Sequence, residues 1–359
     1  MLKAVPTSQA QQKHDKRELY TLAVTKAETI SIKKVFDTKS MLSTRKANVQ
    51  LDNPIHITGE ALTKFTDSKN QPYVHNVTLT DADTGNILLQ RFAPPFLNIA
   101  ELMDQRATEG ICKFQNVCTT AKCKKHSPTT CQIEDWQKSL HFHFGAWYNQ
   151  TKVNLVISSE THQAGNEAGK PAVADFIAWF KIFFSEHVQK SIVNNKNSGL
   201  CDSFCQELTD REQIHFPWAN KHVEGLDVIC QPLYLTFSLF QGFSGTSHID
   251  NKDADVSILI NLGQHAILEL HEYNCQLVLQ PLDVVFFLLN SVYHHTLQHP
   301  AHIEEGSDPN DQMAITCLFH KALMMQKEPK KHNILYLICC ATEKQEAERQ
   351  KELKRKLED

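Results

Sequence analysis

The second half of the chain is a succession of short apolar segments separated by turn residues. From residue 226 onward eight segments follow one another: Val228–Cys230, Tyr234–Phe240, Val256–Leu262, Ala266–Leu270, Gln276–Leu279, Val284–Leu289, Tyr293–Leu297 and Met313–His320. Apolar runs of this length between turn residues are typical of β-strands, and many in series predict a sandwich or barrel. We therefore predict a mostly β protein with supporting helices and a double-stranded β-helix (jelly-roll) core.

Charge and periodicity divide the rest of the chain. Residues 1–50 carry a formal charge of +6 and residues 321–359 carry +3. Because the whole chain has a net charge of −4, residues 51–320 carry −13. The basic ends are interpreted as solvated tails, with contact to nucleic acid as the alternative. The predicted organisation is a basic, largely flexible arm (1–50), a β-rich region with a Cys/His cluster (51–150), a jelly-roll domain with supporting helices (151–330), and a charged C-terminal helix or tail (331–359).

One long helix is predicted ahead of the strands. From Pro171 the apolar residues change to helical spacing, and Asn194–Gly199 ends the pattern. The residues on the apolar stripe are Val173, Phe176, Ile177, Phe180, Phe184, Val188 and Ile192. A shorter helix is expected at Cys201–Leu208.

No segment of the sequence suggests a membrane protein. The apolar run Ile334–Ala341 is too short to span a bilayer, and the first residues lack the apolar core of a signal peptide. We expect an intracellular protein, cytoplasmic or nuclear, in which the eleven cysteines are thiols or metal ligands. The sequence leaves the oligomeric state open.

A cluster of soft ligands lies in a polar stretch rich in Lys, Thr and Ser. Its members are Cys112, Cys118, Cys123, His126 and Cys131. Four ligands of this type can hold a structural zinc ion, which would fix a loop that has little apolar content. The cluster lacks a tight C-x2-C pair, so free thiols are the competing interpretation.

The most specific chemical signal is the stretch Gly245-Thr-Ser-His-Ile-Asp250. Alternate side chains of an extended strand share a face, so His248 and Asp250 can point the same way. A second histidine follows about forty residues later, at His294 or His295. Two imidazoles and one carboxylate form the facial triad of non-haem Fe(II) oxygenases, which leaves coordination positions open. The competing interpretation of His248 and Asp250 is a hydrogen-bonded pair in a surface loop.

Other histidine and cysteine patterns are weaker candidates for metal binding. They are His141 with His143, His222 with Glu224, His302 with Glu304, and Cys201 with Cys205. The first pair alternates with phenylalanines, which is common on a half-buried strand. Neither His-x-Glu pattern precedes a predicted strand that is followed by a second histidine.

The order of motifs resembles the core of the Fe(II)/2-oxoglutarate dioxygenases over residues 226–322. The matching runs are Ser247-His-Ile-Asp250, Ile258-Leu-Ile-Asn-Leu-Gly263, Leu268-Glu-Leu270, Leu279-Gln-Pro-Leu-Asp-Val-Val-Phe-Phe287 and Tyr293-His-His-Thr296. Within that superfamily, the run Asn261–Leu270 is similar to fungal and algal relatives of the TET/JBP nucleobase oxygenases.

This resemblance implies Fe(II) and 2-oxoglutarate as cofactors. It places His248 and Asp250 at two of the ligand positions, and spacing from the Phe286-Phe287 pair favours His294 over His295 as the third. An iron-dependent dioxygenase that hydroxylates or oxidises an organic substrate is the predicted function. A modified nucleobase is favoured by resemblance alone, because the acidic middle of the chain gives nucleic acid no electrostatic support.

The chain departs from the family in its last predicted strand. An arginine normally follows the distal histidine there and holds the far carboxylate of 2-oxoglutarate through its bidentate fork. Gln312 stands at that position, and no arginine lies between Arg211 and Arg349. A lysine from another strand can replace this arginine, and Lys321 and Lys252 are the candidates. With Asn261 and Gln312 they make up the set of candidate cofactor-binding residues.

The missing arginine is also compatible with two different kinds of protein. The cosubstrate can differ from 2-oxoglutarate, or the barrel can keep iron ligands without turnover. The alternative function is accordingly a non-catalytic jelly-roll binding module of mobile-element origin, or a metal-dependent oxygenase that uses another cosubstrate.

Overall fold

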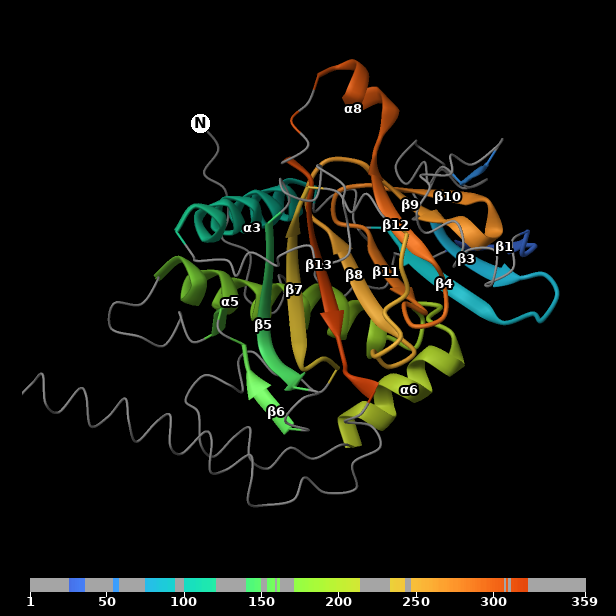
Figure 1. The fold of residues 1–359 in the computed structure, drawn as a ribbon, viewed down its shortest axis with the longest axis horizontal. Helices are drawn as coiled ribbons and strands as arrows, with labels where there is room; N and C mark the ends of the chain where they lie inside the picture. Colours follow the sequence, from blue (N-terminus) through green and yellow to red (C-terminus); the bar gives the residue numbers. More distant parts are fainter. Residues whose placement is uncertain are drawn as a thin grey trace, which may run out of the picture.

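The chain folds into two β-sheets with helices against the larger one (Figure 1). The computed structural model describes residues 26–35, 54–57, 75–93, 100–120, 140–149, 154–158, 160–161, 171–213, 233–242, 247–306, 308 and 311–321. Within these ranges no helix has the length and apolar character needed to cross a membrane.

The larger sheet has nine strands, and it combines the predicted core with the region before it. In spatial order the strands are β1 (Lys26–Ile32), β3 (His75–Asp81), β4 (Ile87–Phe92), β11 (Val284–Phe287), β8 (Ser257–Asn261), β13 (Met313–Leu318), β7 (Thr236–Gln241), β5 (Leu140–Asn149) and β6 (Asn154–Ile157). All neighbours are antiparallel except β1 and β3. Because β4 pairs with β11, the early strands form an outer part of the same sheet.

The smaller sheet has four strands and packs across an apolar interior from the larger one. Its order is β12 (His294–Gln298), β9 (Ala266–Leu270), β10 (Cys275–Leu279) and β2 (Ile55–Ile57). Leu268 and Leu277 belong to one buried cluster with Val285 and Phe287 of β11. The strands alternate, so every second residue of β9 and β12 points into this interior.

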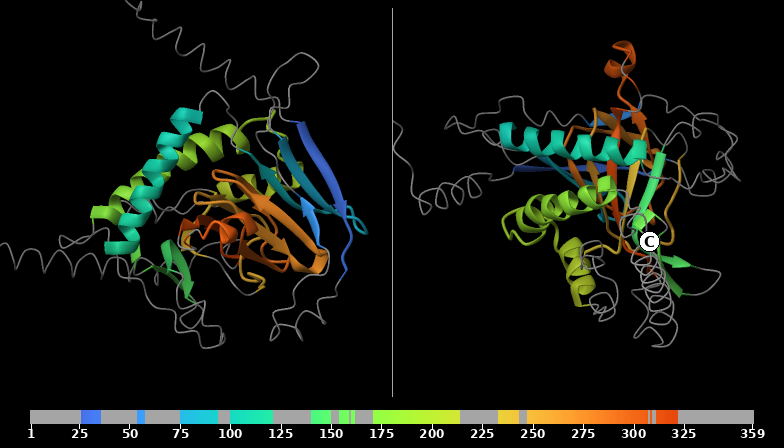
Figure 2. Two further views of the ribbon diagram at one scale, coloured as in Figure 1. Left: turned by 90° about the horizontal axis from the view of Figure 1, so that it is seen from above. Right: turned by 90° about the vertical axis from the view of Figure 1, so that its left-hand side faces the viewer.

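Helices cover the opposite face of the larger sheet, as the views in Figure 2 show. They are α3 (Ala100–Thr120), α5 (Pro171–Phe183), the π-helix η2 (Phe184–Val193) and α6 (Asp202–Gln213). All seven residues of the predicted helical stripe are buried, which confirms that assignment. Two short helical elements, η3 (His271–Tyr273) and α8 (Pro300–Glu304), follow β9 and β12.

Seven of the eight predicted strand segments contain or overlap observed strands, and the first, Val228–Cys230, lies outside the described residues. The description of residues 51–150 as β-rich was incomplete, because α3 occupies 100–120. Its buried or partly buried side, formed by Gly110, Ile111, Phe114, Val117 and Cys118, has helical spacing. Gly110 lies so close to the Trp179 ring of α5 that a Cβ atom there would be 2.2 Å from it. The predicted C-terminal helix also lies outside the described residues.

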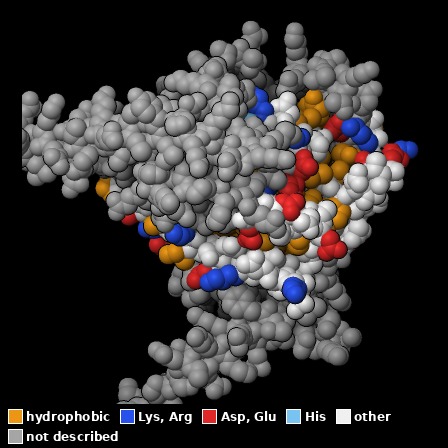
Figure 3. All heavy atoms as spheres, turned by 90° about the horizontal axis from the view of Figure 1, so that it is seen from below, with side chains coloured by type: hydrophobic (Ala, Val, Ile, Leu, Met, Phe, Trp, Pro, Cys, Tyr) orange, Lys and Arg blue, Asp and Glu red, His pale blue; other side chains and the backbone are white. Residues whose placement is uncertain are grey.

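The surface seen from below carries both signs of charge. In Figure 3 the coloured Asp and Glu side chains lie beside Lys and Arg side chains and apolar ones. On the described part of this face the charges are therefore mixed.

Phe180 of α5 tests the helix–sheet packing. Its ring is 1% exposed and lies 4.6 Å from that of Phe237 on β7, centroid to centroid. We expect Phe180→Ala to lower the free energy of unfolding by about 3–5 kcal/mol, because it leaves a cavity. Ile182→Ala is the control on the same helix, where the side chain is 58% exposed and a change within about 0.5 kcal/mol is expected. Equal effects in urea unfolding would contradict this packing.

Candidate metal centre

His248 and His294 are held opposite each other by their main chains. The N–H of each donates to the carbonyl oxygen of the other, at 3.0 Å in both directions. The imidazole centroids are consequently 4.5 Å apart. The Asp250 N–H donates to the Leu289 carbonyl oxygen at 3.0 Å, which ties the third residue to the turn that precedes β12.

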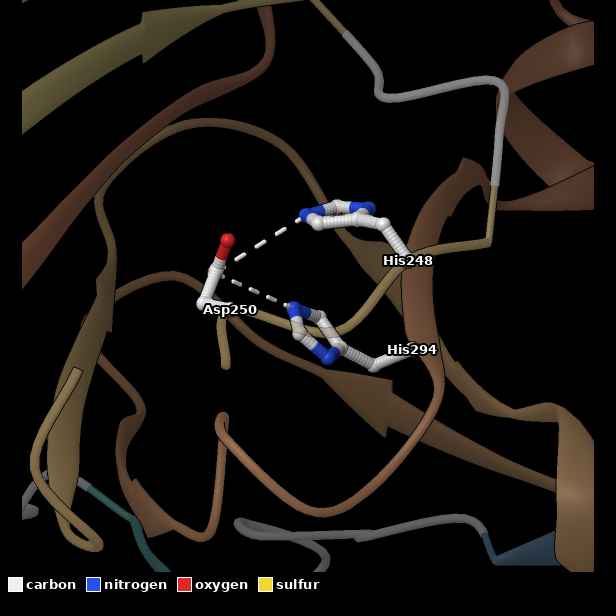
Figure 4. Close-up of side chains that lie close together, drawn as sticks. All are labelled: His248, Asp250 and His294. Atoms are coloured by element: carbon white, nitrogen blue, oxygen red, sulfur yellow. Dashed lines mark ion pairs between the residues drawn. The ribbon is translucent and has the colours of Figure 1, made fainter. Parts of the chain in front are cut away.

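The three side chains converge, as Figure 4 shows. Asp250 Oδ2 lies 3.9 Å from His248 Nε2 and 3.8 Å from His294 Nε2. The three ligand atoms lie within 4.8 Å of one another, so one ion can contact all of them. The structure therefore brings together His248, Asp250 and His294, the preferred set from the sequence.

The His294 ring presents a lone pair toward Asp250. Its Nδ1–H donates to the Val292 carbonyl oxygen at 2.9 Å, since a carbonyl can only accept. Burial, with His248 nearby, lowers the pKa of His294 well below its usual value, so the ring is neutral. A neutral imidazole whose other nitrogen is fixed by a backbone carbonyl is a typical arrangement for a metal ligand.

Asp250 and His248 face an opening. Their side chains are 38% and 35% exposed, whereas that of His294 is 7% exposed. Burial raises the pKa of the Asp250 carboxyl group, and the His248 imidazole acts in the opposite direction. A bound cation would stabilise the ionised carboxylate, because an opposite charge favours the charged form.

A hollow that opens to solvent adjoins the three ligands. Its apolar walls come from both sheets and include Phe240, Leu259, Leu268, Phe287, Leu289, Ala314 and Leu318. Its other polar lining residues are His141, His295, Thr296, Gln312 and Thr316. A mostly apolar hollow with a few convergent polar groups is the usual form of a small-molecule site.

Lysine and arginine are absent from the described residues that line this cavity. The backbones of Lys252 and Lys321 are hydrogen-bonded to each other, and neither side chain is part of the lining. The buried Arg91 and Arg211 donate to the carbonyl oxygens of Val278 and Leu233, at 3.1 and 3.2 Å. The described part of the cavity thus offers no guanidinium or ammonium group to a carboxylate.

Gln312, the residue just before β13, pairs with Asn261 of β8. Gln312 Nε2 donates to Asn261 Oδ1 at 2.7 Å, and Asn261 Nδ2 donates to the carbonyl oxygens of Gln264 and Gln280 at 3.1 and 3.0 Å. These donations fix both amide orientations. Gln312 Oε1 is left buried without a hydrogen-bond partner among the described residues.

His295, the second choice for the distal ligand, belongs to a different group. It adjoins the same cavity, but its side chain points to the other face of the strand from that of His294, because adjacent residues of a strand alternate between faces. With Glu269 and His271 it forms a buried His/Glu/His triad whose ligand atoms also lie within 4.8 Å of one another. The sequence interpretation missed Glu269 and His271 as ligands, although Glu269-Leu-His271 is itself an acid-x-His pattern.

The weaker candidates do not form metal clusters within the described residues. Cys112 and Cys118 lie on α3, whereas Cys123, His126 and Cys131 lie outside the described residues, so the zinc prediction stays a prediction. His143 bonds to Ser238 Oγ at 2.6 Å, and His302 contacts His265. The Cys205 thiol donates to the Leu200 carbonyl oxygen. His222 and Glu224 also lie outside the described residues.

No protein-family model and no curated protein matches the sequence. Among solved structures, the chain is similar to NgTET1 in complex with 5mC DNA, with a TM-score of 0.43 and 16% sequence identity. The match covers 84% of this chain and 98% of that chain. The chemistry proposed for the site rests on the chain's own side chains.

The Asn261–Gln312 pair gives a test of how the cavity is built. We expect Asn261→Ala to lower the free energy of unfolding by about 1–3 kcal/mol, because it leaves Gln312 Nε2 and two carbonyl oxygens without their partner. Asn86→Ala, at an exposed position, is the control and should change stability by less than about 0.5 kcal/mol. A wild-type unfolding midpoint in Asn261→Ala would show that the pair does not hold the cavity wall.

Proposed function

We propose that the chain is an Fe(II)-dependent dioxygenase that oxidises an organic substrate in the cavity, with a jelly-roll core of the double-stranded β-helix type. The supporting observation is the convergence of His248, Asp250 and His294 beside that cavity. Two neutral nitrogens and one carboxylate oxygen suit Fe(II) and leave coordination positions for a cosubstrate and dioxygen. Bound iron would supply the activation of dioxygen.

The protein's own residues prepare the site for this chemistry. The reciprocal main-chain hydrogen bonds set the spacing of the two imidazoles, and Val292 fixes the His294 tautomer. Leu268, Phe287 and Leu289 line the hollow with apolar surface, which limits water around a reacting group. The exposed sides of His248 and Asp250 leave an approach for the substrate.

The proposed cosubstrate is 2-oxoglutarate, and the proposed substrate class is a modified nucleobase. Both follow from the sequence motifs rather than from the cavity. The lack of Lys and Arg among the described lining residues favours a second candidate, a metal-dependent oxygenase with a cosubstrate that lacks a second carboxylate. A binding module without turnover is the third candidate, and measurements of iron binding and succinate formation separate the first candidate from the other two.

Iron binding tests the ligand set. Under anaerobic equilibrium dialysis, we expect His248→Ala and Asp250→Ala each to bind one equivalent of Fe(II) less than the wild type, because each loses a ligand. His302→Ala is the matched control, since His302 lies on α8 outside the cavity lining. Unchanged iron content in both ligand variants, with folding verified by circular dichroism, would end the proposal.

Turnover tests the cosubstrate. With Fe(II) and dioxygen, the wild type is expected to convert 2-oxoglutarate to succinate, while His248→Ala should lose at least about 100-fold of this activity, more than about 2.7 kcal/mol in barrier terms. Iron binding without succinate would overturn 2-oxoglutarate as the cosubstrate and favour the second candidate or the binding module.

A further inference from the structure

We propose that Glu269, His271 and His295 bind a second divalent metal ion, Zn²⁺, on the outer face of the smaller sheet. This site is separate from the proposed iron centre and does not depend on it. The three residues come from β9, from the short helix η3 that follows it, and from β12. All are buried, with exposed fractions of 4%, 6% and 8%.

Strand register places these ligands together. His295 is the direct cross-strand partner of Glu269, as His294 is of Leu270. His294 and Leu270 point into the interior, so His295 and Glu269 share the opposite face. The chain turns into η3 immediately after Leu270, and this returns His271 toward the Glu269 carboxylate.

One carboxylate oxygen of Glu269, Oε1, faces both imidazoles, and the other accepts a hydrogen bond from Gln276. Gln276 Nε2 donates to Oε2 at 2.7 Å and thereby fixes the plane of the carboxylate. Oε1 lies 3.2 Å from His271 Nδ1 and 3.5 Å from His295 Nε2. Ligand atoms around tetrahedral Zn²⁺ are separated by about 3.3 Å, which follows from bond lengths of ~2.0–2.1 Å. The two separations at Glu269 lie on either side of that value.

Hydrogen bonding alone leaves this group incompletely satisfied. His295 turns its Nε2, and not its buried Nδ1, toward the Glu269 carboxylate, so Nε2 is the nitrogen that would contact the proposed ion. The 3.5 Å between His295 Nε2 and Glu269 is at the outer limit for a hydrogen bond. Two imidazoles and one carboxylate in a closed position are a ligand set that Zn²⁺ accepts, with water in a fourth place.

Such an ion would couple the two metal centres mechanically. It would join β9, η3 and β12 at one point and hold His295 in place. The residue next to it, His294, is a proposed iron ligand, so the second ion would restrict the backbone that positions it. We expect a structural role for this ion, because its ligands are buried.

The test is zinc stoichiometry in the full chain, measured in a His248→Ala background so that the proposed iron centre does not contribute. Zinc content after equilibrium dialysis is compared between His248→Ala and the double variants with Glu269→Gln or with Glu305→Gln. Glu305 is the matched control, because its side chain is 67% exposed. Zinc held by any cysteine cluster is the same in all three proteins and cancels in the comparison.

We expect Glu269→Gln to remove one equivalent of zinc, or to weaken its binding at least tenfold, while Glu305→Gln removes none. Added Zn²⁺ should raise the Tm of His248→Ala and of the Glu305 control by more than it raises the Tm of the Glu269 variant. If Glu269→Gln fails to fold, His271→Asn replaces it in the same comparison. If that variant also fails to fold, the Tm of His248→Ala is measured before and after a chelator removes its metal. Equal zinc content in all variants, or a Tm insensitive to zinc and chelator, would overturn the second site.

Discussion

The reciprocal backbone pairing of His248 and His294 is the constraint on which the candidate site depends. These residues are 46 positions apart in the sequence, yet each donates its N–H to the other's carbonyl oxygen at 3.0 Å. The pairing brings the segment before β8 against the start of β12. Main-chain hydrogen bonds of this kind fix the spacing of the two imidazoles without any bound ion.

The first two residues of β12, His294 and His295, belong to two different groups of candidate metal ligands. His294 points into the interior between the sheets, toward a cavity with an opening, whereas its neighbour His295 points to the outer face and meets Glu269. One group is partly exposed and suits an exchangeable, reactive ion. In the other group, all three side chains are buried, which suits a structural ion. Strand alternation, rather than a difference in ligand type, decides which group of side chains each histidine joins.

Much of the fold could be predicted because its signals are local. The β9 segment was predicted at its observed bounds, and the helical stripe from Val173 to Ile192 is buried as expected. Helix α3 was missed although Gly110, Phe114 and Val117 have helical spacing, because the cysteines in this stretch favoured a metal-binding loop. The triad residues were identified from motif order, but the roles of His294 and His295 depend on cross-strand register. Glu269 and His271 became visible as ligands only once that register placed them beside His295.

The central claim is that His248, Asp250 and His294 hold iron. Anomalous diffraction from crystals of the full chain grown anaerobically with Fe(II), recorded on both sides of the iron edge, tests this directly. We predict an iron peak between the two Nε2 atoms and the Asp250 carboxylate, within coordination distance of all three. An iron-replete crystal with no peak between these three side chains would contradict it.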